Sequence, residues 1–303
     1  MTSGPGTAWT GQPQSGHPDH IGKYVVEEYL GGGMCHVYRA KDPLIGKTVA
    51  VKILKPENNS DPESRDRFLR EARVAANMEH PNIVSVYSFV PDEAQPYMVM
   101  EFLKGDDLST IIKENRTGDV ANKLRIALQI ANALQYIHGQ QIVYRDVKPK
   151  NIHVNESGVV KMMDFGIAKT EDLNLTRPGF TMGTPYYMAP EQIQGKGVTY
   201  LADVYAYGIL LYELFTGSRP VTGENFEQIF YWHLRESIDV KPLEQAAVPQ
   251  SIITVISACT AKDPLQRPQK LSEICPVLVR EIDAIEGSSK PPAAAGSPRS
   301  SIR

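Results

Sequence analysis

The chain has 303 residues and a formal net charge of -3 at pH 7, so it carries no excess positive charge that would favour nucleic acid or an anionic membrane surface. Hydrophobic residues make up 42% of the sequence and charged residues 22%, which is typical of a soluble globular protein. A chain of this length holds one large domain or two smaller ones, and either buries a substantial core.

The sequence carries three widely spaced cysteines, Cys35, Cys259 and Cys275, with no C-x-x-C pair. An odd and sparse set argues against a disulfide framework and is typical of a reducing compartment. No apolar run approaches the roughly 18 residues needed to span a bilayer, and the N-terminus lacks the basic-then-apolar pattern of an export signal. We therefore expect a cytoplasmic chain without a membrane segment.

Both ends of the chain differ from the middle. Residues 1–21 are rich in Thr, Ser, Gly, Pro and Gln, residues 286–303 contain a Pro-Pro-Ala-Ala-Ala run, and neither shows hydrophobic periodicity. Such segments bury too little apolar surface to offset the cost of chain ordering. We expect two disordered tails around one folded domain, residues 22–285, and find no internal repeat.

Strands are predicted first along the folded part. An extended apolar run over 24–30 leads into a glycine cluster and resumes over 37–40, so the glycines lie in a hairpin turn. Residues 49–54 alternate with a period of two, which predicts a further strand. A glycine turn lets backbone N–H groups approach a phosphate closely, although most such turns are plain hairpins. The glycines are Gly31, Gly32 and Gly33.

A helix is predicted next. Asp61 can cap it with Pro62 at the first helical position. Phe68, Ala72 and Ala75 recur at helical spacing, and His80-Pro81 is expected to end the helix.

Helices dominate after another short strand at 97–102, with long ones expected over 120–138 and 201–216. This order predicts an α+β fold of two lobes, strand-rich over 22–100 and helix-rich over 106–285, joined at 101–105 with a cleft between them.

Lys52 lies inside the apolar strand over 49–54, where an unpaired ammonium would be costly. Glu71 on the following helix can supply one anionic partner, and a nucleotide phosphate the other. Taken without these neighbours, a lysine that reaches solvent from an edge strand explains the position equally well.

The strongest chemical signal is the segment 144–151, which reads YRDVKPKN, followed by DFG at 164–166. Asp146 can accept a proton from a substrate hydroxyl, and Lys148 can neutralise a moving phosphoryl group. Asn151 and Asp164 offer the hard oxygen ligands that Mg²⁺ prefers. A predicted hairpin, with strands at 152–154 and 159–163, brings Asn151 and Asp164 side by side.

These motifs in this order resemble those of the eukaryotic-like Ser/Thr protein kinases of bacteria, over residues 24–283. The resemblance implies a bilobal kinase fold that transfers the γ-phosphate of ATP to Ser or Thr hydroxyls of proteins. Protein substrates are the implied partners, together with a second copy of the chain in a transient homodimer that phosphorylates its own activation loop. The implied cofactors are ATP and Mg²⁺, with Mn²⁺ as an alternative ion.

The resemblance also assigns roles to single residues. The catalytic set is Asp146 as base, Lys148 on the γ-phosphate and Lys52 on the α- and β-phosphates, oriented by Glu71. Asn151 and Asp164 would hold the metal ion. The remaining nucleotide-binding positions are Gly31, Gly32, Gly33, Val37, Ala50, Met100 as gatekeeper, Glu101 and Leu103 in the hinge, and His153.

Further residues resemble the parts that organise a kinase site. Glu191 is expected to pair with Arg267, and Asp203 to brace the catalytic loop. Residues 183–191 resemble the substrate-docking end of the activation loop, and Lys148 with Gly183-Thr184 resembles the Ser/Thr rather than the Tyr branch.

The activation loop also holds two candidates for phosphorylation, Thr176 and Thr181. Arg145 directly before Asp146 is the type of residue that pairs with a phosphorylated loop. Threonines that are simply solvated are the competing interpretation.

Four positions depart from the family pattern. The glycine loop is one residue short, with Cys35 in place of the third glycine, and Cys35 is either a modification site or an unreactive thiol. Tyr144 replaces a usual His, and Lys150 stands where many kinases that prefer basic substrates carry Glu. His153 replaces the apolar side chain beneath adenine, where it either packs against the purine or turns aside to a backbone carbonyl.

Two other functions stay open at this point. The irregular glycine loop is the one feature that favours a nucleotide-binding pseudokinase scaffold. A small-molecule phosphotransferase of similar fold is the other, although residues 183–191 argue against it because they resemble a platform for a protein substrate.

Overall fold

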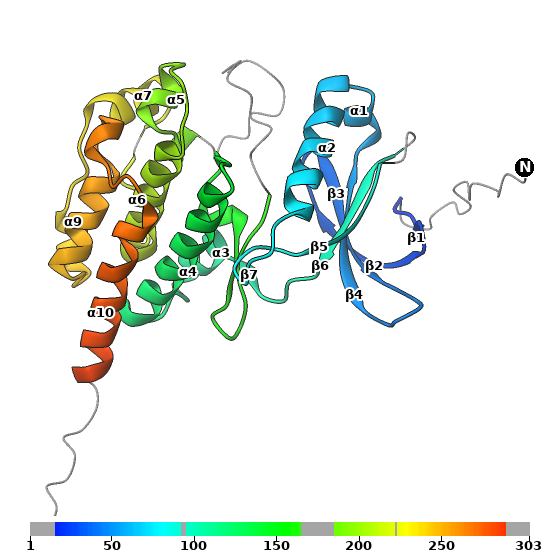
Figure 1. The fold of residues 1–303 in the computed structure, drawn as a ribbon, viewed down its shortest axis with the longest axis horizontal. Coiled ribbons are helices and arrows are strands. Elements are labelled where there is room, and N and C mark those ends of the chain that lie inside the picture. The colour runs from blue at the N-terminus through cyan, green and yellow to red at the C-terminus, as the bar shows by residue number, and fades with distance from the viewer. Residues whose placement is uncertain (1–15, 92–94, 165–184, 222, 289–303) are drawn as a thin grey trace, which may run out of the picture.

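The computed structural model describes residues 16–91, 95–164, 185–221 and 223–288, which form two lobes side by side (Figure 1). Thr176 and Thr181, together with Phe165, Gly166, Gly183 and Thr184, lie outside the described residues. Among the helices of the described part, none is both long and apolar enough to cross a membrane.

The first lobe is built on one antiparallel sheet, whose strands follow the order β1-β2-β3-β4-β6-β5 within the described residues. The strands are β1 (His20–Ile21), β2 (Tyr24–Gly31), β3 (Cys35–Lys41), β4 (Thr48–Leu54), β5 (Val86–Val90) and β6 (Tyr97–Glu101). Apolar side chains that alternate along β2, β3 and β4 form a small core with Val99 of β6. The predicted strands are present, and β5 is an addition that the sequence patterns missed.

A short helix α1 (Pro56–Asn59) and the longer α2 (Pro62–Ala76) complete this lobe. The carboxylate of Asp61 accepts a hydrogen bond from the Ser64 N–H at 3.0 Å, which caps α2 as predicted. Phe68 and Ala72 on the inner face of α2 are buried against Leu54 and Met98. This packing presses α2 against the sheet and thereby sets the position of every other residue on the helix.

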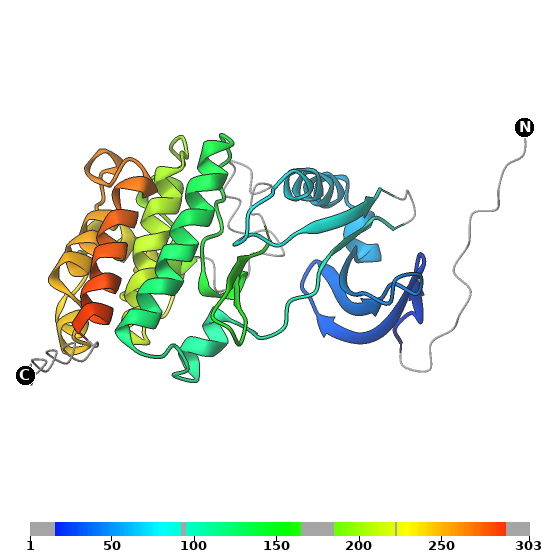
Figure 2. The same cartoon turned by 60° about the horizontal axis from the view of Figure 1, so that its bottom comes forward.

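The second lobe is mainly helical. Its helices are α3 (Leu108–Lys113), α4 (Val120–Gly139), α5 (Pro190–Ile193), α6 (Leu201–Thr216), α7 (Phe226–Arg235), α8 (Lys241–Gln245), α9 (Gln250–Cys259) and α10 (Cys275–Ser288). Figure 2 shows α4, α6 and α10 running alongside one another. A small sheet of β7 (Asp106–Asp107), β8 (Ile152–Val154) and β9 (Val160–Met162) covers the side that faces the first lobe.

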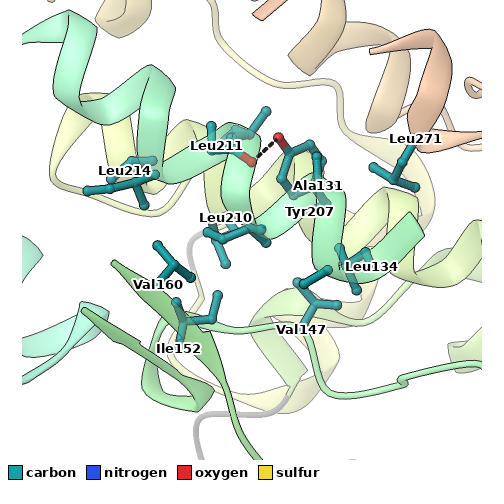
Figure 3. Packing of buried hydrophobic residues seen from close by; sticks show 14 of the residues in the cluster. Ala131, Leu134, Val147, Ile152, Val160, Tyr207, Leu210, Leu211, Leu214 and Leu271 are labelled. Carbon is teal, nitrogen blue, oxygen red and sulfur yellow. Dashed lines mark hydrogen bonds between the residues drawn. The ribbon is translucent and has the colours of Figure 1, made fainter. Parts of the chain in front are cut away.

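The core of the second lobe centres on α6, where most side chains are buried. Leu210 and Leu214 pack toward Ile152 of β8 and Val160 of β9, and the Tyr207 hydroxyl donates to the backbone oxygen of Ala127 at 3.0 Å (Figure 3). The β8–β9 hairpin therefore rests on a rigid apolar layer. Because residues 151 and 164 flank this hairpin, the layer also supports the polar groups that lie there.

The chain between β6 and β7 links the two lobes. Among the contacts between the lobes is a backbone contact of the segment before β5 with strand β9. In that contact the Met162 N–H donates to the backbone oxygen of Asn82 at 2.8 Å, and the Val84 N–H donates to the backbone oxygen of Met162 at 3.0 Å.

Two predicted boundaries need correction. His20 and Ile21, which the prediction placed in the tail over 1–21, pair with β2, and Ile21 is buried. Residues 286–288, which the prediction placed in the tail over 286–303, belong to α10, and Glu286 forms an ion pair with Arg125. Ile21 packs in the core of the first lobe and Glu286 pairs with a residue of α4, and the local composition does not register such contacts.

Candidate active site

Lys52 on β4 connects three elements of the structure. Its Nζ donates to Glu71 Oε1 on α2 and to Asp164 Oδ1 after β9, each at 2.7 Å. Strand β4 has β3 on one side and β6 on the other, so the alternative of a lysine on an edge strand is wrong. Burial alone would lower the pKa of Lys52, but the carboxylates of Asp164 and Glu71 outweigh it and raise the pKa well above its ordinary value. Lys52 is therefore a permanent cation where the two lobes meet.

The polar loop 144–151 holds a second connected group. The Asn151 amide donates to the backbone oxygen of Asp146 at 3.0 Å and to its Oδ2 at 2.8 Å. Lys148 Nζ lies 2.9 Å from the same Oδ2. The short 3₁₀ turn Pro149–Asn151 brings Asn151 back toward Asp146. The structure thus joins three of the predicted site residues around one carboxylate.

Asn151 and Asp164 are adjacent through the backbone, because the Met163 N–H donates to the Asn151 carbonyl at 2.9 Å. Lys52 contacts one carboxylate oxygen of Asp164, and this side chain keeps 52% of its surface exposed. The Asn151 amide uses its NH₂ group on Asp146, so its oxygen is not engaged in that contact. Mg²⁺ is commonly held by one or two protein oxygens together with substrate phosphates, and this donor set fits such an ion.

Asp203 on α6 fixes the loop that carries Asp146. Its side chain is 1% exposed and accepts hydrogen bonds from the Tyr144 N–H at 2.8 Å, the Arg145 N–H at 2.7 Å and His138 Nε2 at 2.9 Å. Arg145 has a φ of 63°, a left-handed conformation that costs a non-glycine residue about 1–2 kcal/mol. The bonds to Asp203 stabilise this conformation, and the predicted brace is present.

Tyr144, which replaces the usual family residue, is fully buried. Burial raises the pKa of its phenol well above the ordinary value, so the hydroxyl stays protonated. It donates to the backbone oxygen of Met163, directly before Asp164. The substitution therefore ties the loop 144–151 to the chain at Asp164.

The β2–β3 turn requires glycine. Gly31 has a φ of 104° and Gly32 a φ of 138°, and a Cβ on Gly32 would lie 2.0 Å from the backbone oxygen of Cys35. The Cys35 side chain is buried against Leu54 and Phe68. Burial raises the pKa of its thiol to about 11, which favours the unreactive alternative.

The other predicted nucleotide-binding residues lie along neighbouring strands. Val37 is the register partner of both Gly31 and Lys52, and Ala50 is the partner of Met100. Of the predicted hinge residues, Glu101 ends β6 and Leu103 lies two positions beyond it, and both are half-buried. The carboxylate of Glu101 is engaged elsewhere, 2.9 Å from Lys161 Nζ on β9. The sequence patterns missed this ion pair, because no local signal joins the two residues.

His153 lies in the middle of β8, opposite Asp107 on one side and Lys161 on the other. Its Nε2 is buried and has no hydrogen-bond partner among the residues that the structure describes. No described backbone carbonyl accepts from this atom, so the alternative in which Nε2 turns aside to such a carbonyl gains no support.

Beyond the loop 144–151, a buried ion pair anchors the segment that follows residue 184. Arg267 donates to both carboxylate oxygens of Glu191, from Nη1 at 2.7 Å and Nη2 at 2.8 Å, as predicted. Tyr187 donates to Glu213 of α6, and the guanidinium of Arg219 lies 3.7 Å from the centre of the Tyr186 ring. The turn Pro185–Tyr187 is thereby held on the second lobe, on the same side as α7.

Comparison with known proteins gives consistent results. Residues 24–276 match the family described as protein kinase domain. The serine/threonine-protein kinase PrkC of Bacillus subtilis is 38% identical over 248 residues, which cover 81% of this chain and 38% of that protein. The probable serine/threonine-protein kinase PknB of Bifidobacterium longum is 37% identical over 265 residues, which cover 83% and 38%.

A solved structure is also similar. The crystal structure of Rad53 in complex with AMP-PNP has a TM-score of 0.70 and 30% sequence identity, and the match covers 84% of this chain and 64% of that one. The chain spans about two fifths of the length of the curated relatives named above.

Proposed function

This chain belongs to the protein kinase domain family, and we propose that it is an ATP-dependent Ser/Thr protein kinase. The observation that carries the proposal is the pair of connected groups of polar side chains where the two lobes meet. Lys52 contacts Glu71 and Asp164, while Asp146 contacts Lys148 and Asn151. This arrangement supplies two cations, a base and two oxygen ligands in one site, which is what phosphoryl transfer requires.

Each residue has a defined task in this proposal. Lys52 binds the α- and β-phosphates, and Glu71 keeps its ammonium pointed at them. Asp146 accepts the proton of the incoming hydroxyl, and Lys148 neutralises charge on the transferred group. Asn151 and Asp164 would hold Mg²⁺, with Mn²⁺ as an alternative, and the ion would neutralise the phosphates. Most of the rate acceleration then comes from positioning and charge neutralisation.

The proposed substrates are proteins with Ser or Thr hydroxyls, including a second copy of the chain. The relatives named above are serine/threonine-protein kinases by name, and the turn Pro185–Tyr187 with its Glu191–Arg267 anchor supports a platform for protein substrates. Autophosphorylation on Thr176 or Thr181 in a transient homodimer is part of the proposal. So is a cytoplasmic location, which the sparse cysteines support.

The alternative of a pseudokinase scaffold has less support than an active kinase. It drew on the short glycine loop, yet Gly31 and Gly32 adopt the turn and Lys52 keeps both of its partners. No observation favours it over an active enzyme.

The direct test mixes the purified chain with labelled ATP, Mg²⁺ and a generic basic protein. We expect label on the protein and on the chain itself, with the chain's label mapped to Thr176 or Thr181. Asp146→Asn should lower turnover at least about 100-fold, because the general base is lost. Near-normal transfer by this variant would show that the site is wrongly assigned.

A further inference from the structure

The outer edge of strand β9 is bonded by side chains as well as by backbone. β9 is the last strand of the small sheet β7-β8-β9, and its edge away from β8 presents the N–H and C=O groups of Val160 and Met162. Both residues are fully buried, where an unpaired backbone group is costly. The Met162 groups bond to the backbone of Asn82 and Val84. The Val160 groups bond to two amide side chains instead.

The side chains of Asn82 and Gln129 make these bonds, and we call the pair the amide clasp. Gln129 Oε1 accepts from the Val160 N–H at 3.0 Å, and Asn82 Nδ2 donates to the Val160 backbone oxygen at 3.0 Å. The same two side-chain atoms also meet, because Asn82 Nδ2 donates to Gln129 Oε1 at 2.9 Å. Gln129 Nε2 donates to the Gly158 backbone oxygen at 2.9 Å. A backbone N–H only donates and a backbone carbonyl only accepts, so Val160 fixes the orientation of both amides.

The amide clasp joins three parts of the structure. Gln129 lies on α4, whose inner face is buried in the core of the second lobe. Asn82 belongs to the segment before β5, and in that segment the Ser85 backbone oxygen accepts from the Glu101 N–H of β6 at 2.8 Å. Strand β6 pairs in turn with β4, which carries Lys52. The clasp therefore connects the sheet of the first lobe to α4 and β9 of the second.

Strand β9 leads to Asp164, whose backbone φ of 51° is a left-handed conformation that is strained for a residue with a side chain. Such a conformation persists only where the surrounding structure fixes it. The strand that enters Asp164 supplies this support, because its inner edge is paired with β8 and its outer edge is bonded by the clasp. The Asp164 carboxylate must itself be placed accurately, since it contacts Lys52 at 2.7 Å.

We propose that Asn82 and Gln129 are positioning residues for phosphoryl transfer. Through Val160 and strand β9 they hold the Asp164 carboxylate where it meets both Lys52 and Mg²⁺. The proposal rests on the function proposed above. Lys52 belongs to the first lobe and Asp164 to the second, so the distance between them depends on contacts that cross between the lobes. The clasp is such a contact, and Val160 lies four positions before Asp164.

The competing interpretation is that the two amides only stabilise the fold. Their loss would then lower the Tm, while a variant measured well below its Tm would bind Mg²⁺ and nucleotide as the parent does. Positioning predicts instead that Mg²⁺ contributes less to nucleotide binding. A hydrogen-bond partner of a metal ligand typically contributes about 10- to 100-fold to metal affinity. The clasp acts at a greater distance, through the strand, so we expect a change of about fivefold.

Calorimetry with AMP-PNP tests the clasp without any phosphoryl transfer. The measured quantity is the Mg²⁺ enhancement, which is the Kd for AMP-PNP without Mg²⁺ divided by the Kd with Mg²⁺. Gln129→Met keeps the length of the side chain but leaves the Val160 N–H and the Asn82 amide without their acceptor, so it should lower the enhancement about fivefold. Gln129→Glu keeps the accepting oxygen and should restore most of the enhancement. A Gln129→Met variant with the enhancement of the parent would overturn the proposal.

Gln135→Met is the matched control, because Gln135 is an exposed residue of the same helix whose side chain lies against Cys275 rather than β9. It should leave the Mg²⁺ enhancement unchanged. An equal loss in Gln135→Met and Gln129→Met would assign the effect to α4 as a whole and overturn the proposal. Circular dichroism at the temperature of the binding measurement checks that each variant is folded.

A double variant tests whether the two amides act as a pair. Asn82→Ala alone should also lower the Mg²⁺ enhancement, and it provides a second route if Gln129→Met does not fold. Because both side chains act on Val160, the double variant Asn82→Ala with Gln129→Met should lose no more than the more impaired single variant. Losses that add would show that the two residues act separately and would contradict the proposal.

A kinase assay then connects the clasp to turnover. Gln129→Met should raise the KM for ATP in the presence of Mg²⁺ about fivefold and leave the KM for the protein substrate unchanged. Equal increases in both KM values would contradict the proposal. A chain that shows the expected differences in Mg²⁺ enhancement but transfers no phosphate would instead refute the proposed function. The role of the clasp in placing Asp164 would then stand.

Discussion

Replacing Asp203 by Asn tests how the fold supports the catalytic loop. The carboxylate accepts from two backbone N–H groups on one segment, those of Tyr144 and Arg145, and from His138 Nε2. An amide of the same shape keeps one oxygen and replaces the other by an NH₂ group. His138 can adapt by changing its tautomer, but a backbone N–H cannot. Whichever way the amide turns, one buried N–H of the loop loses its acceptor.

The cost follows from these contacts. A hydrogen bond to a charged group contributes about 1.5–3 kcal/mol, and a buried donor left without an acceptor costs a further 1–3 kcal/mol. We therefore expect Asp203→Asn to lower the free energy of unfolding by about 3–5 kcal/mol. For a domain of this size that corresponds to a Tm lower by roughly 6–15 °C. Because Arg145 would also lose support for its left-handed conformation, we expect kcat to fall at least about tenfold.

The assay is thermal unfolding followed by circular dichroism, together with steady-state kinetics on the same preparation. Asp66→Asn is the control, because Asp66 forms an exposed ion pair with Arg70 one turn along α2. That change should cost less than about 0.5 kcal/mol and leave kcat unchanged. An Asp203→Asn variant that unfolds within about 1 kcal/mol of the parent and keeps its kcat would refute the reasoning.

Three further predictions concern single side chains. Burial raises the pKa of Cys35 to about 11, so its thiolate fraction at pH 8 is about one thousandth. Iodoacetamide should therefore label the more exposed Cys275 before Cys35, as followed by intact-mass and peptide analysis. Equal labelling rates of the two cysteines would contradict this. Burial also lowers the pKa of Lys262 from 10.5 to about 8. Between these values the unfolded chain binds a proton that the folded chain does not, so stability should rise with pH from 8 to 10.5. The difference between the Tm of the parent and the Tm of Lys262→Met should therefore increase from pH 8 to 10.5 in favour of the parent. A difference that stays constant over this range would show that Lys262 is not desolvated. His153→Leu removes a buried nitrogen that has no described partner, so it should raise the Tm. The variant should also bind ATP at pH 7.5 at least as well as the parent, as measured by calorimetry. Weaker binding would show that the imidazole contributes to nucleotide binding.

Several features could be predicted from the sequence because they depend on neighbouring residues. The cap of α2 at Asp61 and the bounds of α6 at Leu201 and Thr216 agree with the prediction, since capping and helical periodicity operate over a few positions. The order of the charged and polar groups in 144–151 could likewise be recognised as a functional motif, because an ordered run of such residues is rarely accidental. Strand β5 escaped detection because it lies at the edge of its sheet and its side chains are only partly buried.

Tertiary structure decided which of these groups act together. Lys52 and Asp164 are 112 positions apart, and Tyr144 and Asp203 are 59 apart, yet each pair is in direct contact. The burial of Cys35 likewise follows from packing between elements. A sequence pattern reports the conformational preferences of a short stretch of chain. Contacts across such separations form only when the apolar faces of several helices and strands are buried together, and that burial is a property of the whole chain.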